Sequence, residues 1–70
     1  MASVISVTCG RNIVVVKTHP GLAQAVAAGI DGMHIPEILG CVAGDDTIMV
    51  AVRTTEETEI LMEKIEQLIE

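Results

Sequence analysis

Two adjacent carboxylates, Asp45 and Asp46, follow Gly44 in a short turn between two apolar segments. Such a pair suits a guanidinium, because the planar fork of donors of that group matches carboxylate geometry. On spacing alone, ordinary turn chemistry in water is the simpler interpretation, since Gly-Asp turns are common. A catalytic carboxylate pair is a weaker alternative, because the nearby sequence supplies no nucleophile, oriented base or deep apolar pocket.

A second polar pair, Gln24 and Asp31, lies seven residues apart in a segment with helical periodicity. Seven residues make two helical turns, so both side chains should lie on the same side of the helix, away from the stripe that faces the sheet. Ala27 and Ala28 lie between them, and a small-residue face of this kind lets a ligand or another backbone approach closely. The simpler interpretation is that both are ordinary solvent-facing helix residues.

The histidines and cysteines do not indicate a metal site. His19 and His34 flank the predicted helix with no further ligand at metal-binding spacing, and Cys9 and Cys41 form no Cys-x-x-Cys motif. We expect both cysteines to be small buried residues at strand ends, with reduced thiols.

Four strands and two helices are predicted to position these residues. The strands are expected at residues 4–8, 13–16, 38–43 and 47–53. The first helix should follow Pro20-Gly21 and end near Gly32, and the second should begin after a capping box in which Thr54 is the N-cap and Glu57 is N3. The side chains expected to face the sheet are Leu22, Val26, Gly29, Ile30 and Met33 in the first helix, and Thr58, Leu61, Met62, Ile65, Leu68 and Ile69 in the second.

The order β-β-α-β-β-α predicts an α+β fold of two layers. A four-stranded, mostly antiparallel sheet should be covered on one face by two helices, with residues 1–70 forming a single domain. The chain has no Phe, Tyr or Trp, so its core must consist of smaller apolar side chains. Small domains usually need a disulfide, a metal or a partner subunit for stability, and here partner subunits are the expected choice.

Composition excludes several classes of function. The net charge of −6 is opposite to what phosphate-backbone binding requires, so the chain should not bind nucleic acid by itself. No apolar run approaches the roughly 20 residues of a membrane helix, and we expect a soluble, cytoplasmic protein. We expect no enzymatic activity, because no nucleophile or pocket is evident.

Several stretches together resemble the C-terminal domain of bacterial arginine repressors. They are Val15-Val16-Lys17-Thr18 running into Pro20-Gly21, then Ala23-Gln24-Ala25, then Pro36-Glu37-Ile38-Leu39-Gly40, and finally Ala43-Gly44-Asp45-Asp46-Thr47-Ile48. The similarity covers roughly residues 4–69, and the combination of Lys-Thr-x-Pro-Gly with Ala-Gly-Asp-Asp-Thr at this distance is specific to the family.

The resemblance implies a trimer, and a hexamer made of two stacked trimers, with L-arginine as corepressor ligand at the trimer–trimer interface. No other cofactor and no metal are implied. The residues that match the family's L-arginine site are Gln24, Asp31, Cys41, Ala43, Asp45 and Asp46. Arginine would thereby stabilise the hexamer, the form that binds operator DNA in the repression of arginine metabolism genes.

Two departures from the family pattern concern the site and its surroundings. The family usually has Thr at the position of Cys41, which puts that contact with the ligand in doubt, and Leu or Ser at the position of His19. Family members also carry an N-terminal winged-helix domain that binds operator DNA. Because 70 residues leave no room for it, we expect DNA binding to reside outside this chain.

Two classes of function therefore follow from the sequence. The first is a ligand-gated oligomerisation module that responds to L-arginine. The second is a constitutive assembly domain with no small-molecule ligand, for which the aromatic-free core and the alanine face would suffice.

Overall fold

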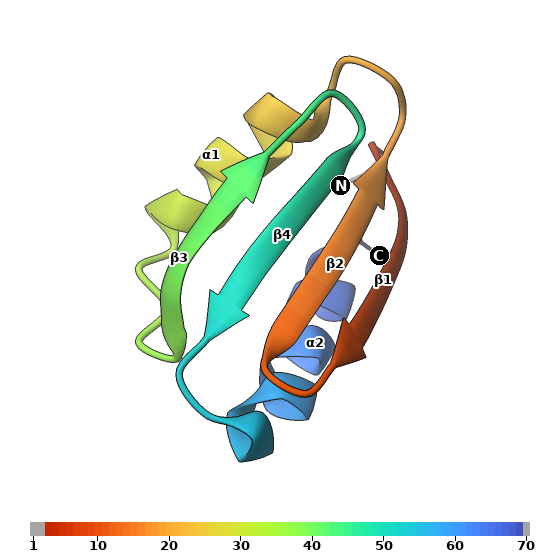
Figure 1. Cartoon of the computed structure of the whole chain (residues 1–70). Helices are drawn as coiled ribbons and strands as arrows, with labels where there is room; N and C mark the ends of the chain where they lie inside the picture. Colours follow the sequence, from red (N-terminus) through yellow and green to blue (C-terminus); the bar gives the residue numbers. More distant parts are fainter. Residues whose placement is uncertain (1–2, 70) are drawn as a thin grey trace.

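The structure of the chain, a computed structural model, describes the backbone of residues 3–69 and the side chains of residues 3–67. Figure 1 shows the elements in the order predicted from the sequence. They are β1 (Val4–Gly10), β2 (Ile13–Thr18), α1 (Ala23–Gly32), β3 (Ile38–Ala43), β4 (Thr47–Val52) and α2 (Thr55–Ile69). The predicted α+β class is confirmed.

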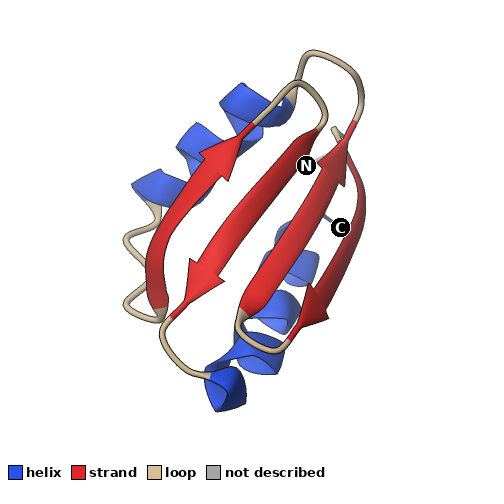
Figure 2. Cartoon of the chain, viewed as in Figure 1, coloured by secondary structure: helices blue, strands red, loops and turns tan. Residues whose placement is uncertain are grey.

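The four strands form one sheet in the order β1-β2-β4-β3, and every neighbouring pair is antiparallel. The β-branched strand β2 is therefore central, while β1 and β3 are edge strands. Both helices lie on the same face of the sheet (Figure 2). Helix α1 packs mainly against β3 and β4, and α2 packs mainly against β1.

The hydrophobic core lies between the sheet and the helices. Alternate residues of the central strands point into it, as the two-residue period of a strand requires. The strand side chains that are fully buried are Val14, Val16, Ile48, Val50 and Val52. In α2 the predicted positions Thr58, Leu61 and Ile65 are buried, whereas the side chains of Leu68 and Ile69 lie outside the described residues.

The buried side of α1 differs from the prediction. Leu22 and Met33 are exposed because they precede and follow the helix, as its N-cap and C-cap. Gly29 is also exposed. The residues that face the core are Ala23, Val26, Ala27 and Ile30. Ala27 therefore faces the core and not the polar side of the helix, where the sequence had placed it.

The start of α2 follows its predicted cap. The backbone N–H of Glu57 donates to Thr54 Oγ1 at 3.2 Å, and the hydroxyl of buried Thr58 donates to the Thr54 carbonyl at 3.1 Å. These bonds satisfy polar groups that the first turn of a helix leaves without partners. No helix in the described part of the chain is long and apolar enough to cross a membrane.

The second face of the sheet carries no helix, and we call it the open face (Figure 2). Between the buried positions of β2 and β4, the alternate side chains Val15, Lys17, Met49 and Ala51 point to this face. Val42 of β3 pairs with Met49, and they are 71% and 48% exposed. The domain thus presents apolar side chains on a surface that its own helices leave uncovered.

Candidate functional site

Two side-chain hydrogen bonds join α1 to the edge strand β3. The Gln24 amide donates from Nε2 to the carbonyl oxygen of Ala43 at 3.1 Å, and the Cys41 thiol donates to Asp31 Oδ1 at 3.3 Å. Gln24 and Asp31 therefore lie on the same side of α1, as their spacing predicts. That side faces β3, whereas the sequence had placed it away from the sheet, because the core-facing side of α1 differs from the predicted stripe. We call the strip formed by Gln24, Asp31, Cys41 and Ala43 the seam.

The strand side of the seam follows from the alternation of β3. Cys41 and Ala43 pair with Val50 and Ile48, which are buried, so both point toward the helix layer. Both are only partly buried, because β3 is the edge strand and α1 covers it incompletely. Cys9 also differs from expectation, since it lies within edge strand β1 and is exposed instead of buried.

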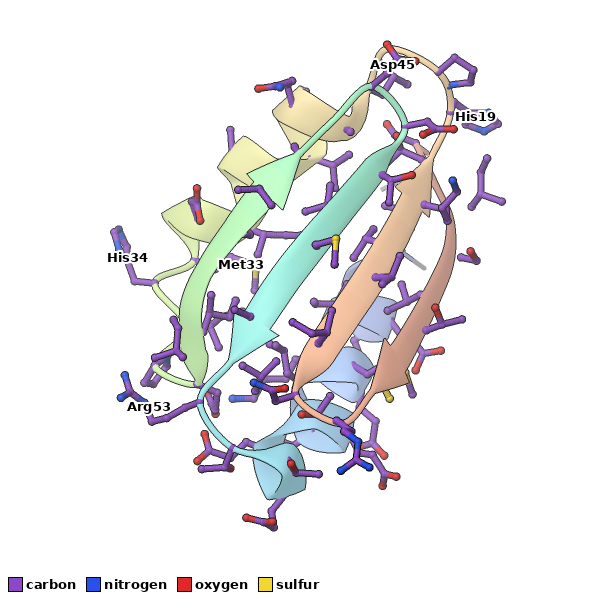
Figure 3. All side chains as sticks on the ribbon, viewed as in Figure 1. His19, Met33, His34, Asp45 and Arg53 are labelled. Atoms are coloured by element: carbon purple, nitrogen blue, oxygen red, sulfur yellow. The ribbon has the colours of Figure 1, made fainter. Side chains whose placement is uncertain are left out.

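The β3–β4 hairpin tip is fastened to the loop that leads into α1. The carbonyl oxygen of Asp45 accepts the N–H groups of Gly21 at 3.1 Å and Ala23 at 3.2 Å, and that of Asp46 accepts the N–H of Thr18 at 2.8 Å. Because the N-cap residue of α1 makes no side-chain cap, Asp45 performs this role through its backbone. Its carboxylate remains exposed at the end of the molecule (Figure 3).

The two aspartates of the turn have different surroundings. The Thr47 hydroxyl donates to Asp46 Oδ1 at 2.8 Å, and Lys17 Nζ lies 3.6 Å from Asp46 Oδ2. These contacts lower the pKa of Asp46, first through the Thr47 hydrogen bond and then through the charge of Lys17. Lys17 also donates to the Thr47 hydroxyl at 2.8 Å. Asp46 is thus held by open-face residues and not by the seam.

The predicted site residues consequently form an extended strip. Gln24 and Asp31 are seven residues apart, which corresponds to about 10 Å along a helix axis. Gln24, Ala43 and Asp45 belong to the hairpin end of α1, whereas Asp31 and Cys41 belong to its other end. The structure therefore brings the predicted residues together in two groups on one edge of the domain, and it directs the Asp46 carboxylate elsewhere.

A cavity of about 400 Å³ adjoins the far end of the seam. Its polar lining residues are Asp31, His34 and Arg53, and its apolar ones include Ile35, Ile38 and Leu39. Figure 3 shows His34 and Arg53 away from Asp45, toward the opposite end of the domain. The sequence alone did not indicate a site made of Asp31, His34 and Arg53. Arg53 is 22 positions from Asp31, and only the fold of the sheet and the α1–β3 loop brings the two residues to one cavity.

The described residues contain no cluster of side chains arranged to bind a metal ion. Across residues 3–69, no three His, Cys, Asp or Glu side chains gather in a way that could hold a metal ion. A second depression of about 400 Å³ lies on the open face, and it is lined by Ile13, Gly40, Cys41, Val42, Met49 and Ala51.

The fold and the seam together define a small α+β domain whose polar groups line an exposed edge. Comparison with known proteins gives this domain a family. Residues 1–67 match the family described as "Arginine repressor, C-terminal domain". The chain therefore belongs to the arginine repressor family and corresponds to its C-terminal domain. This is a family of repressors and not of enzymes.

Individual relatives are similar over nearly the whole chain. The "Arginine repressor" of Lachnoclostridium phytofermentans is 52% identical over 65 residues, which are 93% of this chain and 43% of that protein. That of Heliobacterium modesticaldum is 50% identical over 68 residues, or 97% of this chain and 45% of the relative. That of Thermotoga maritima is 46% identical over 64 residues, which are 91% of this chain and 42% of the relative. The chain thus spans less than half the length of these relatives.

Proposed function

We propose that this domain senses L-arginine and uses it to control assembly of a transcriptional repressor. The observation that carries the proposal is the seam, where Gln24 and Asp31 of α1 are hydrogen-bonded to β3. The exposed carboxylate of Asp45 lies at the Gln24 end of the seam. Carboxylates suit both the guanidinium and the α-ammonium group of arginine, and amide and backbone groups suit its α-carboxylate. Family membership supports the choice of ligand.

A single chain does not enclose such a ligand. Binding sites for small molecules usually bury about 70–90% of the ligand surface, whereas Gln24, Asp31 and Asp45 are all exposed at the edge of one sheet. We therefore propose that arginine binds between subunits, with residues of two chains contributing to each ligand.

The open face supports assembly independently of the ligand. Val42 is 71% exposed and Met49 is 48% exposed, and both adjoin a mainly apolar depression. A domain of 70 residues buries only about 60% of its unfolded surface, so covering this face with another copy would stabilise it. We propose that copies of the chain form a trimer, and that two trimers stack into a hexamer with arginine between them.

The mechanism follows from linkage. A ligand that binds only at an interface between trimers stabilises the hexamer over free trimers, by an amount that grows with ligand concentration. In the longer protein, the hexamer would present DNA-binding domains, located outside this chain, to operator DNA in the cytoplasm. Regulation of arginine metabolism genes would then depend on the arginine level.

Measurement of assembly mass with and without arginine tests this proposal. We expect millimolar L-arginine to shift trimers to hexamers and to raise the melting temperature. Citrulline is the matched control, because it keeps the shape of arginine without the charge, and we expect it to bind more weakly. If arginine changes neither quantity while the domain is folded, the proposal is wrong.

A constitutive assembly domain is the second candidate function. The apolar open face favours it, because that surface can hold copies together whether or not a ligand is present. Calorimetric titration separates the two functions. An arginine sensor gives a saturable heat with arginine, and a purely structural domain gives none.

A further inference from the structure

The side chain of Cys41 donates its hydrogen bond to a carboxylate that the proposed function assigns to the ligand. The Cys41 sulfur lies 3.3 Å from Asp31 Oδ1, and the two residues belong to different elements, β3 and α1. In the described part of the chain, Cys41 is the side chain that hydrogen-bonds to Asp31. Asp31 itself is exposed, near the last turn of a ten-residue helix. Without the thiol, its carboxylate would rotate freely in solvent.

The thiol is present as the donor at neutral pH. The pKa of Cys41 is raised, first by burial of the sulfur and then by the hydrogen bond to Asp31, whose negative charge disfavours a thiolate. Cys41 is half-buried beneath α1, next to core residues, so its side chain is held in place by packing. A fixed donor under a mobile carboxylate selects one orientation of that carboxylate.

We propose that Cys41 is a positioning residue for the ligand site, which holds the Asp31 carboxylate in the orientation that receives a cationic group of the ligand. The inference rests on the proposed arginine-binding function and adds to it a role for the thiol through Asp31. A thiol is a weak donor, but an acceptor that is ionised strengthens its bond. Ordering the carboxylate before binding reduces the entropy that binding loses, and this raises affinity.

A pair of variants that differ in one group tests this role. Cys41→Thr keeps a donor on a β-branched side chain, and Cys41→Val replaces that hydroxyl with a methyl group. We expect Cys41→Val to bind L-arginine about fivefold to tenfold more weakly than Cys41→Thr, the loss associated with one hydrogen bond. Cys41→Ser should also bind more tightly than Cys41→Val. Calorimetric titration of the folded 70-residue chain measures these affinities, and thermal melting of the same samples measures stability.

The frequency of the S–H stretching band, measured by infrared spectroscopy, reports the hydrogen bond of the thiol directly. A role of Cys41 in packing alone would not lower this frequency. With Asp31 present, the band of Cys41 should lie at lower frequency than that of a free thiol, and Asp31→Ala should return it to the free position. Cys9→Ser in every sample removes the other thiol, which is exposed on β1. A Cys41 band that Asp31→Ala leaves unchanged overturns the inference.

The outcomes distinguish this inference from the proposed function. If wild-type chain binds arginine, and Asp31→Asn weakens binding while Cys41→Val and Cys41→Thr bind equally, Cys41 does not position Asp31 but the arginine site stands. If both Cys41 variants weaken binding to the same extent, the residue acts through packing and the inference is wrong. Absence of arginine binding by the wild-type chain overturns both.

Discussion

The backbone carbonyl of Asp45, at the tip of the β3–β4 hairpin, accepts the N–H of Ala23, the first residue of α1, at 3.2 Å. The start of the helix is therefore capped by a residue more than 20 positions away in the sequence. Because the cap uses the main chain, the Asp45 side chain does not take part in it. One residue thus fixes the helix against the hairpin and still presents a carboxylate beside the seam.

Substitution of Asp45 by Ala separates these two roles. The backbone cap remains, so we expect the free energy of unfolding to change by no more than about 0.5 kcal/mol, as for other exposed positions. Arginine affinity should fall by about tenfold or more, because a hydrogen bond to a charged group contributes about 1.5–3 kcal/mol. Thermal melting and calorimetric titration measure the two effects. Glu63→Ala, an exposed substitution on α2, is the control and should alter neither.

Gly21 gives a prediction about the same junction. Its φ of +81° lies in the left-handed region, and its N–H donates to Asp45, but no heavy atom lies within 4 Å of an added Cβ. We expect Gly21→Ala to destabilise the domain by roughly 1–2 kcal/mol through backbone strain alone. The melting temperature should fall by about 4–8 °C for each kcal/mol.

Gly32 is the matched control for Gly21. It ends α1 with equal space around it and without a positive φ. Gly32→Ala should therefore raise stability by about 0.5–1 kcal/mol, because alanine loses less conformational freedom in a helix. Equal effects of the two substitutions on the melting temperature would contradict this explanation.

The strands were predictable from the sequence because two-residue alternation and turn residues are local signals. The segment Ile38–Ala43 matches its prediction at both ends, and β2 continues two residues beyond Val16 into Thr18, which is buried. The side of α1 that faces the core was harder to predict. Val26 and Ile30 belong both to the predicted set of core-facing residues and to the observed set, and the small residues around them can join either set. The choice depends on where the helix begins, and the backbone of Asp45 fixes that point from another part of the chain.

The candidate site was predictable only in part for the same reason. The shared side of Gln24 and Asp31 follows from helix geometry, and the structure confirms it. The partners of Asp46 depend on the strand register that places Lys17 opposite Thr47. The hydrogen bond from the Cys41 thiol to Asp31 depends on how closely α1 approaches β3. Neither distance is encoded in local spacing, and ligand binding by these residues stays a prediction.

Val42 provides a test of assembly through the open face. Its side chain is 71% exposed on an edge strand, so Val42→Lys should leave the fold of the single subunit intact. If another copy covers the open face, a lysine ammonium would lose its hydration there, and the assembly should dissociate at concentrations where wild-type chain remains associated. Analytical ultracentrifugation measures the shift. Glu66→Lys is the control. It places a lysine at an exposed position of α2, away from the open face, and should leave association unchanged.

Acid titration tests the environment of Asp46. Contacts with Thr47 and Lys17 lower the pKa of the folded-state carboxylate. A lowered folded pKa means that these contacts contribute stability above the ordinary Asp pKa of about 4, and that this contribution is lost as the pH falls through the folded value. Thr47→Val removes the first of the contacts, so the pKa of Asp46 should rise toward its ordinary value and the acid-induced loss of stability should become smaller.

Carboxyl-carbon NMR chemical shifts measure the pKa of Asp46 directly, and melting curves at several pH values measure the stability. Lys64→Met is the control, because Lys64 donates to Glu37 at 2.7 Å and lowers the pKa of that residue instead. This control should raise the pKa of Glu37 and leave that of Asp46 unchanged. An Asp46 titration that is the same in wild-type and Thr47→Val protein would show that the Thr47 hydrogen bond does not lower its pKa. The Thr47 hydroxyl would then have no electrostatic role at the hairpin.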